Sequence, residues 1–339
     1  HKGCLASRTP SIIIGLYHND REGDSLRNGI VLGANSPYRI TVILKLFKIL
    51  RSLDGINTIF HVHLFPAILY VAIFKRFGII KGKIVVTDHS TSNSRAKKWY
   101  GKILDRFMFR SYDQIYAISN GVKDSIAKRG LVEKNQIVVI KNGIDIYFKK
   151  PMLRSYKPPL RIVSVGSLRA PKNYRNIIMA LASVSFREWH YYIAGEGEDL
   201  DSLNKLIKHL RLRENITLLG RVDPIQPLLE KAHLFLMPSI WEGFGLAAAE
   251  AMNASLPIVI SDIQGLSELI KDAPVHEPPG VFVDPNSITE LTKALQDIFT
   301  NYPNYQKLGY NGWKHSFNYD RRIMQMQYVN EYKRLSFNV

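Results

Sequence analysis

The chain is 339 residues long, with 46% apolar and 22% charged residues. This composition is typical of a folded globular protein and excludes a disordered or fibrous one. The length is enough for two domains of ordinary size, and a single cysteine excludes an internal disulfide.

Positive charge is concentrated in the first half of the chain. Residues 1–150 hold 25 Lys and Arg against 10 Asp and Glu, whereas residues 151–339 hold 21 against 19. The change in charge, together with the proline-containing stretches at 149–151 and 157–159, predicts a domain boundary near residue 150. It also indicates that the first domain meets an anionic partner.

Short apolar runs alternate with helical patterns throughout. The strands expected in the first half are 11–17, 58–63, 83–87, 114–118 and 136–141, and those in the second are 160–166, 189–194, 215–219, 233–237, 257–260 and 280–283. Continuous apolar runs such as 137–140 are typical of parallel strands buried on both faces. The pattern predicts an α/β fold with two doubly wound domains, 1–150 and 151–319, and ligand at the carboxyl ends of the strands. A helix over about 320–335 is a candidate to pack back on the first domain.

The stretch from Ile56 to Phe74 contains no Asp, Glu, Lys or Arg, and its length approaches the ~20 residues of a membrane-spanning helix. Polar residues and Pro66 interrupt it, however. We therefore expect a buried strand over 57–63 and a helix that opens at Pro66, where proline suits the first turn.

Two segments of the first half carry basic stripes. Residues 39–53 predict an amphipathic helix with one apolar face (Ile40, Ile43, Leu44, Phe47, Leu50) and one basic face (Lys45, Lys48, Arg51). A second stripe (Lys98, Lys102, Arg106, Arg110) runs beside Trp99, Ile103 and Phe107. Two interpretations stand: surface helices with solvated basic faces, or interfacial helices that dock on anionic lipid. No nucleic-acid recognition motif accompanies the charge.

The most informative segment runs from residue 238 to 252. Gly243 and Gly245 allow a tight turn and close backbone approach to a ligand, and a helix expected to begin near Leu246 offers free N–H groups to an anion such as a diphosphate. Glu242 precedes this turn, and Glu250 lies one helical turn after Leu246, so its carboxylate can reach back. Two carboxylates beside a phosphate site suit the hydroxyls of a sugar and a ribose. Either glutamate alone would pass for an ordinary surface residue.

No convincing metal site accompanies this segment. Asp199 and Asp201 open an expected helix, where acidic residues suit the dipole. A lysine such as Lys172, with a helix N-terminus, can balance the charge of a bound diphosphate in place of a metal, so we expect no metal and no cofactor. His61 and His63 share one strand face but lack the further ligands that a structural zinc site needs, so we interpret them as core or cleft-lining residues.

The segment 242–250, with two glutamates flanking a Gly-Phe-Gly loop, resembles the retaining glycosyltransferases of the GT-B fold, family 4 (glycosyl transferases group 1). Further segments are similar to that family in the same order: 85–90, 117–123, 140–145, 165–173, 195–197, 219–222 and 261–268. The resemblance covers nearly the whole chain. It implies two Rossmann-like domains that face a central cleft and close over a nucleotide-sugar, UDP-linked in our expectation.

The resemblance also implies roles for individual residues on the sugar side. Glu242 and the backbone of Phe244 and Gly245 would hold the hydroxyls of the donor sugar, next to Gly243. His89, on the other domain, would hydrogen-bond the same sugar.

On the nucleotide side, the resemblance assigns the Leu246 N–H to the β-phosphate and Glu250 to the ribose. Lys172 would neutralise the diphosphate. Arg221 and Val222 would flank the base.

The chain departs from the family at two places. The family usually has arginine where Ser167 follows Gly166. Arg169 would point to the same side if this segment is extended, and its planar fork suits two phosphate oxygens, so we hypothesise that Arg169 is the substitute. Residues 1–35 also lack the family's Gly-Gly pair, so either the first strand precedes His1 or the first domain is altered.

We therefore expect an enzyme that transfers a sugar, with retention of configuration, to a lipid-linked or glycan acceptor of a surface polysaccharide such as capsule, O-antigen or lipopolysaccharide. We expect it in the cytoplasm or on the inner face of the cytoplasmic membrane, held there by its basic first domain. Two alternatives stand: a catalytically silent partner subunit, and a sugar-nucleotide epimerase of the same fold.

Overall fold

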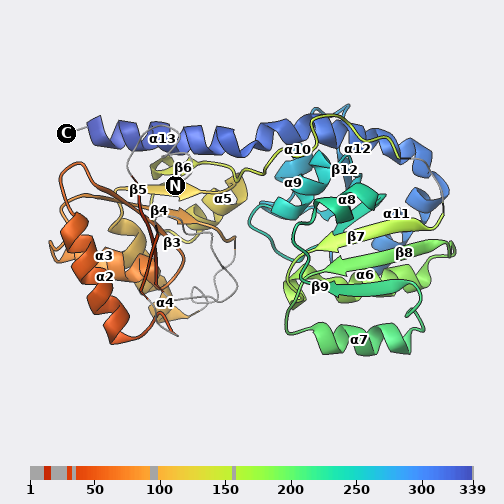
Figure 1. Ribbon diagram of the computed structural model, residues 1–339, viewed down its shortest axis with the longest axis horizontal. Coiled ribbons are helices and arrows are strands. Elements are labelled where there is room, and N and C mark those ends of the chain that lie inside the picture. The colour runs from red at the N-terminus through yellow and green to blue at the C-terminus, as the bar shows by residue number, and fades with distance from the viewer. Residues whose placement is uncertain (1–10, 17–28, 33–35, 92–97, 155–157, 338–339) are drawn as a thin grey trace. The chain divides into compact units, whose positions relative to one another are not determined.

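The computed structural model describes residues 11–16, 29–32, 36–91, 98–154 and 158–337. Contacts divide the chain into two α/β units (Figure 1). Unit 1 comprises residues 1–141 and 322–339, and unit 2 comprises residues 142–321.

Unit 1 is built on a parallel sheet with the order β3-β4-β5-β6. The strands are β3 (Ile59–His63), β4 (Lys83–Asp88), β5 (Gln114–Ala117) and β6 (Ile137–Val139). The helices are α2 (Ile40–Leu53), α3 (Ala67–Arg76), α4 (Trp99–Arg110), α5 (Asn120–Lys128) and α13 (Arg321–Phe337), with a 3-10 turn at Lys134–Gln136. Two short strands, β1 (Ile13–Gly15) and β2 (Gly29–Val31), form a separate parallel pair.

Helix α13 joins unit 1 from the far end of the chain. Its side chains Met324, Tyr328, Tyr332 and Leu335 pack against a cluster formed by Val85, Tyr116 and Ile140 of the sheet. The expected helix over about 320–335 corresponds to this element.

Unit 2 has a six-stranded parallel sheet with the order β12-β11-β10-β7-β8-β9. The strands are β7 (Leu160–Val165), β8 (Trp189–Ala194), β9 (Ile216–Gly220), β10 (Leu234–Met237), β11 (Ile258–Ser261) and β12 (Gly280–Val283). The helices are α6 (Tyr174–Ser183), α7 (Leu200–His209), α8 (Gln226–Lys231), α9 (Leu246–Asn253), α10 (Glu268–Lys271), α11 (Ile288–Thr300) and α12 (Tyr302–Ser316), with 3-10 turns at Ala170–Lys172 and Phe317–Tyr319. The strand order reverses between β7 and β10, and ligands of such sheets bind outside the carboxyl ends at that point.

The predicted strands agree with this topology. Every stretch expected to form a strand contains one, and all pairings in the two large sheets are parallel. Strand β2 was not predicted, because its apolar run is only three residues long, from residue 30 to 32, and lies between two glycines. The turn that follows β1 lies outside the described residues.

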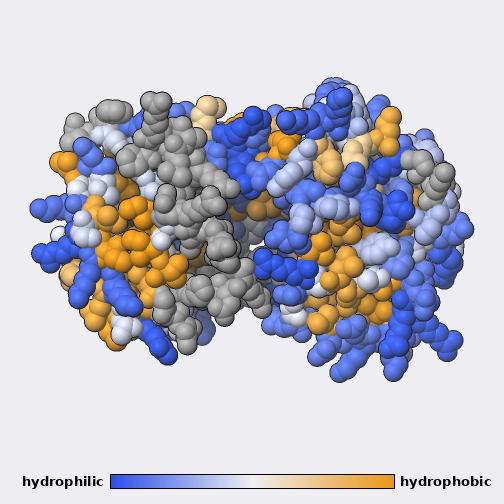
Figure 2. All heavy atoms as spheres, in the orientation of Figure 1, coloured by the Kyte–Doolittle hydropathy of each residue, from blue (hydrophilic) through white to orange (hydrophobic). Residues whose placement is uncertain are grey.

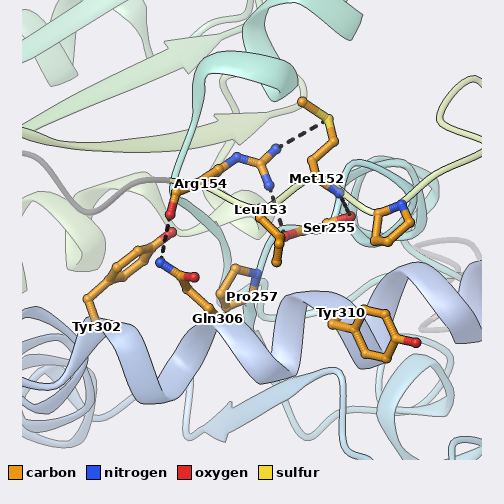
Figure 3. A pocket seen from close by; sticks show the side chains of 9 residues that line it. Met152, Leu153, Arg154, Ser255, Pro257, Tyr302, Gln306 and Tyr310 are labelled. Carbon is orange, nitrogen blue, oxygen red and sulfur yellow. Dashed lines mark hydrogen bonds between the residues drawn. The ribbon is translucent and has the colours of Figure 1, made fainter.

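The connection between the units belongs structurally to unit 2. The N–H groups of Tyr147 and Phe148 both donate to Asn253 Oδ1, at 3.1 Å each. The Arg154 guanidinium donates to the carbonyls of Ala254 (2.6 Å) and Ser255 (3.0 Å) just past the end of α9, where a cation suits the helix dipole (Figure 3). The change in charge near residue 150 therefore falls inside unit 2, and the boundary lies at residues 141 and 142.

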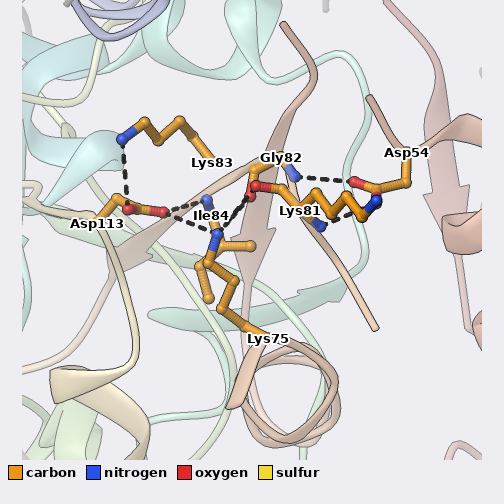
Figure 4. A network of polar contacts seen from close by, with 7 residues as sticks. All are labelled: Asp54, Lys75, Lys81, Gly82, Lys83, Ile84 and Asp113. Atoms are coloured by element: carbon orange, nitrogen blue, oxygen red, sulfur yellow. Dashed lines mark hydrogen bonds and ion pairs between the residues drawn. The ribbon is translucent and has the colours of Figure 1, made fainter. Parts of the chain in front are cut away.

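A polar network fixes the amino ends of the unit 1 strands (Figure 4). Asp54 accepts from the N–H groups of Lys81 (2.8 Å) and Gly82 (2.9 Å), ahead of β4. Asp113 accepts from the Ile84 N–H at 2.7 Å and pairs with Lys75 and Lys83 at 3.8 Å each. These contacts hold the edge of the sheet opposite to the one where ligands of such folds bind.

The exposed faces of α2 and α4 combine apolar and basic side chains. In α2 the buried residues are Val42, Leu46 and Leu50, whereas Ile40 is 65% exposed and Leu44 is 54% exposed. The apolar face expected from the sequence is therefore only partly covered: Leu50 is buried, whereas Ile40 and Leu44 are exposed, because the helix packs through a face that also contains Val42 and Leu46. Figure 2 shows apolar side chains gathered over α2 and α3.

Helix α4 has a similar mixed surface. Its basic stripe (Lys98, Lys102, Arg106, Arg110) is exposed, and so are Trp99 (75%) and Ile103 (62%). Within the described ranges, no helix has both the length and the apolar character needed to cross a bilayer.

Candidate functional site

In unit 2 the loops that follow β7 and β10 are joined by hydrogen bonds. Asn173, in the left-handed conformation (φ 62°), ends the 3-10 turn at Ala170–Lys172. Its side-chain amide donates to the carbonyls of Pro238 (2.9 Å), after β10, and Pro285 (2.7 Å), after β12. The Ile240 N–H donates to Pro171 O at 2.8 Å. The loops that follow β7 and β10, at the strand-order reversal, therefore form one rigid surface. We call this surface the ledge.

Lys172 and Glu242 meet on this ledge. The Lys172 ammonium forms an ion pair with the Glu242 carboxylate, and both side chains are 20% exposed. Gly166 leaves room for the lysine stem, since a Cβ there would lie 3.3 Å from Lys172 Cε. The Tyr174 hydroxyl donates to Gly166 O at 3.0 Å and fixes the end of β7.

The loop before α9 is shaped by close backbone packing. Gly245 (φ 96°) immediately precedes the helix, and a Cβ there would lie 2.4 Å from Leu266 Cδ1. A Cβ on Gly265 would lie 2.5 Å from Gly243 O. Phe244 is buried, with its ring 5.4 Å from that of Tyr319, so only its backbone can face a ligand. The first N–H groups of α9, beginning at Leu246, have no partner within the helix and can receive an anion.

Glu250 lies on α9 next to a second charged pair. Burial raises the pKa of its carboxyl to about 7, an effect that Arg321 opposes and Asp145 reinforces. Asp145 and Arg321 pair at 2.7 Å. A carboxyl poised near neutral pH can change its charge when a ligand binds.

The remaining predicted residues of unit 2 lie in exposed loops. The Arg169 N–H donates to Ser167 O at 2.9 Å, so this segment is a tight turn around the buried Leu168. The expectation of an extended 167–169 segment is therefore wrong, although both side chains are exposed. Arg221 is exposed and lies 3.9 Å from Asp223, and Val222 is half-buried.

In unit 1, His89 follows β4 and belongs to a cluster of imidazoles. His63 Nδ1 lies 3.0 Å from His89 Nε2. Burial and the neighbouring His89 lower the pKa of His63 to about 4, and burial lowers the pKa of His89 below its ordinary value. These rings are therefore neutral at pH 7. No group of three or more His, Cys, Asp or Glu placed to hold a metal occurs in the part of the chain that the structure describes.

The structure thus joins Lys172, Glu242 and Gly166 on one ledge and places Glu250 beside Asp145 and Arg321. His89 lies in the other unit. Sequence reasoning assigned no individual role to Asn173 and Tyr174, which shape the unit 2 site. A possible signal for Asn173 was its position at a strand-to-helix turn, because asparagine tolerates the left-handed conformation. His63 had been interpreted only as a core or cleft-lining residue.

Comparison with known proteins identifies the fold and the family. The architecture is of the GT-B type, with two Rossmann-like domains. The crystal structure of HepE from Anabaena in complex with UDP and glucose superposes with a TM-score of 0.82 at 17% identity, covering 98% of this chain and 94% of that one. The family model described as glycosyl transferases group 1 matches residues 145–315, and the model described as glycosyltransferase family 4 matches residues 18–148. The chain therefore belongs to the group 1 glycosyl transferase family.

Two curated relatives align with part of this chain. It is 26% identical over 215 residues to the O-antigen chain mannosyltransferase RfbU of Salmonella typhimurium, covering 63% of this chain and 60% of the relative. It is 27% identical over 223 residues to the UDP-Gal:alpha-D-GlcNAc-diphosphoundecaprenol alpha-1,3-galactosyltransferase of Escherichia coli, covering 61% and 56%. The chain therefore spans little more than half the length of these relatives.

Proposed function

We propose that this protein is a retaining glycosyltransferase that moves a sugar from a UDP-sugar to a lipid-linked or glycan acceptor of a surface polysaccharide. The observation that carries the proposal is the Lys172–Glu242 pair, held at the strand-order reversal of unit 2 in front of α9. Family membership supports the reaction class, and the activities named for the relatives support the acceptor class.

The chemistry follows from the charges on the ledge. In the transfer, the bond between the anomeric carbon and the β-phosphate oxygen breaks, and the acceptor oxygen bonds to that carbon on the same face. The proton of the acceptor hydroxyl leaves with the diphosphate, which gains negative charge. Lys172 and the N-terminus of α9 stabilise that charge without a divalent ion, because preorganised donors act strongly in a partly buried site. Glu242, released from Lys172, accepts hydrogen bonds from the sugar hydroxyls.

The nucleotide contacts follow the helix. Leu246 N–H meets the β-phosphate, and Glu250 accepts hydrogen bonds from the ribose. Arg221 and Val222 flank the base, and Arg169 adds charge at the diphosphate. His89 contacts the donor sugar.

We also propose that unit 1 docks on anionic membranes through α2 and α4. The exposed Ile40, Leu44, Trp99 and Ile103 lie among exposed lysines and arginines, as in helices that bind the interface between lipid headgroups and acyl chains. Such docking would place the enzyme on the inner face of the cytoplasmic membrane, where lipid-linked acceptors are available.

The test combines transfer and metal removal. Purified protein is incubated with a panel of nucleotide sugars and an undecaprenyl-linked acceptor, with and without EDTA, and the anomeric configuration is determined by NMR. We expect a product of retained configuration and unchanged turnover in EDTA. Loss of turnover in EDTA that Mg²⁺ or Mn²⁺ restores would overturn the metal-free mechanism, and an inverted product would overturn retention.

Matched variants test the site. Lys172→Ala and Glu242→Gln should each lower turnover by about 100- to 1,000-fold, as for the loss of a preorganised charge-stabilising group. Lys314→Ala, which removes an exposed ion pair with Glu277, is the control and should match the parent. Binding of donor without turnover by the parent would favour a silent partner subunit, and release of nucleotide and sugar without acceptor would favour an epimerase.

A further inference from the structure

Three imidazoles occupy the carboxyl ends of β3 and β4 in unit 1. His61 and His63 lie on the same face of β3, and His89 follows the last residue of β4. The ring centroids are 4.2 Å apart for His61 and His63, and 5.3 Å apart for His63 and His89. The rings therefore form a continuous row.

The inner end of this row is immobilised by hydrogen bonds. His61 Nδ1 bonds to the Tyr332 hydroxyl, and His61 Nε2 lies 2.7 Å from Thr87 Oγ1. Thr87 Oγ1 in turn lies 3.1 Å from the Tyr328 hydroxyl. Both nitrogens of His61 therefore form hydrogen bonds. Two tyrosines of α13, one directly and one through Thr87, hold the His61 ring in place, and the His63 ring packs against it.

The outer end of the row consists of one hydrogen bond. His63 Nδ1 and His89 Nε2 are 3.0 Å apart, so one of these neutral rings donates and the other accepts. Among the described residues, neither His63 Nε2 nor His89 Nδ1 has a hydrogen-bond partner. This hydrogen bond occupies Nε2 of His89, so Nδ1 of His89 is the ring nitrogen that can face a ligand.

We propose that His63 is a positioning residue for His89: its Nδ1 holds His89 Nε2, which fixes the orientation of the His89 ring, couples its tautomer to that of His63 and presents Nδ1 to the donor sugar. The consequence for catalysis rests on the proposed function, in which His89 contacts that sugar. The hydrogen bond and the coupling of the two tautomers do not. Which nitrogen of a histidine carries its proton is set by the partner of the other nitrogen.

The test reads the tautomer directly. In ¹⁵N-labelled protein at pH 7, long-range ¹H–¹⁵N spectra distinguish a protonated ring nitrogen from an unprotonated one. We expect one neutral tautomer for His89 in the parent. His63→Phe keeps a ring beside His61 but removes the hydrogen bond, and should give averaged His89 nitrogen signals. His63→Asn places an amide near the position of Nδ1 and should restore a single tautomer.

Kinetics provide the second readout. His63→Phe should lower kcat/KM for the donor by about 10- to 100-fold, since small misplacements near the chemistry have effects of this size. UDP affinity should stay at the parental value, and His63→Asn should recover most of the loss. His190→Phe, which removes a histidine–threonine hydrogen bond from a strand of unit 2, is the control.

The two readouts separate the two hypotheses. Averaged His89 signals in the parent, or an unchanged spectrum in His63→Phe, would overturn the positioning role. Absence of transfer by the parent with every donor would overturn the proposed function and leave the spectroscopic result standing. A changed spectrum with unaltered kcat/KM would show that His89 does not contact the donor in the way proposed.

Discussion

The two units differ in what shapes the carboxyl ends of their sheets. In unit 2 the loops are shaped by backbone: a Cβ on Gly195 would lie 1.9 Å from Gly166 O, and one on Gly197 would lie 2.2 Å from Leu168 O. In unit 1 the corresponding edge is held by side chains, through the histidine row and the tyrosines of α13.

The difference affects how each site responds to change. Loops that are shaped by close backbone packing at glycines leave few conformations open and leave little room for added atoms, which suits the diphosphate site that we propose there. A side-chain network can be altered residue by residue while the backbone stays in place. The edge of the unit 1 sheet can therefore be changed one side chain at a time, without disturbing the backbone.

The first prediction concerns the close backbone packing of the unit 2 loops. Gly195→Ala should lower the free energy of unfolding by at least about 3 kcal/mol, because its methyl group must displace main-chain atoms of Gly166 rather than a flexible side chain. Chemical denaturation measures this loss. Gly220→Ala is the matched control at a glycine of positive φ with nothing within 4 Å, and should cost only about 1 kcal/mol. Equal losses for the two variants would contradict the close-packing argument.

The second prediction concerns Arg169, a side chain that we propose adds charge at the diphosphate beside Lys172. Arg169→Ala should reduce turnover by about 100- to 1,000-fold, as for loss of a preorganised donor to developing charge. Adding Ser167→Arg to that variant should restore part of the rate, because residues 167 and 169 share a tight turn with both side chains exposed. Steady-state kinetics decide the matter, and near-parental turnover of Arg169→Ala would rule the compensation out.

The third prediction concerns the basic residues of α2 in unit 1, compared with those of α7 in unit 2. Replacing Lys48 and Arg51 of α2 with Glu should weaken the affinity for anionic liposomes, measured by sedimentation, by at least about 30-fold, since each basic residue lost contributes ~1 kcal/mol and each glutamate adds repulsion. Lys45 is left intact because its ammonium donates to Leu32 O at 3.2 Å. The same reversal at the exposed Lys205 and Lys208 of α7 in unit 2 is the control.

Salt and lipid composition provide the further check on this docking. Binding should fall steeply as salt rises, because the attraction between exposed charges is screened. Equal binding of the parent to neutral vesicles would contradict the electrostatic contribution.

The fourth prediction uses the raised pKa of Glu250. In the proposed site its ionised carboxylate accepts hydrogen bonds from the ribose, so UDP affinity should be about tenfold weaker at pH 6 than at pH 8, and Glu250→Gln should abolish this dependence. Because the folded-state pKa is about 7 against an ordinary value of 4.5, the carboxyl destabilises the fold as pH rises across that interval. Glu250→Gln should therefore melt at a higher temperature than the parent at pH 8, with no gain at pH 4. Isothermal titration and thermal melts measure the two effects.

Much of this molecule could be predicted from sequence because its strongest signals are local. Buried parallel strands read as continuous apolar runs, and the Gly-Phe-Gly loop lies next to the helix it opens. The α/β fold class and the family were predicted correctly on that basis. The ledge that joins Lys172 to Glu242 follows from the same logic, since both residues come after strands that are neighbours in the sheet.

What could not be predicted depends on long-range packing. The bond between His61 and Tyr332 joins residues 271 positions apart, and no periodicity marks it. The rotation of α2 that exposes Leu44 depends on which neighbours cover Val42 and Leu46. The turn at Leu168 depends on contacts of its backbone with Glu196 and Asp199, on another loop.

Helix α13 belongs to unit 1 but is translated after the whole of unit 2, and this order affects folding during translation. Unit 2 is a continuous stretch, so all of it is available once residue 321 has left the ribosome. Unit 1 begins first but lacks Tyr328 and Tyr332 until the last residues emerge, so its sheet edge stays uncovered while the whole of unit 2 is made. Since domains generally fold as units during translation, the second unit in the sequence completes its fold before the first. A nascent chain arrested when residue 321 has just emerged from the ribosome would therefore carry a protease-resistant unit 2 behind an unfinished unit 1.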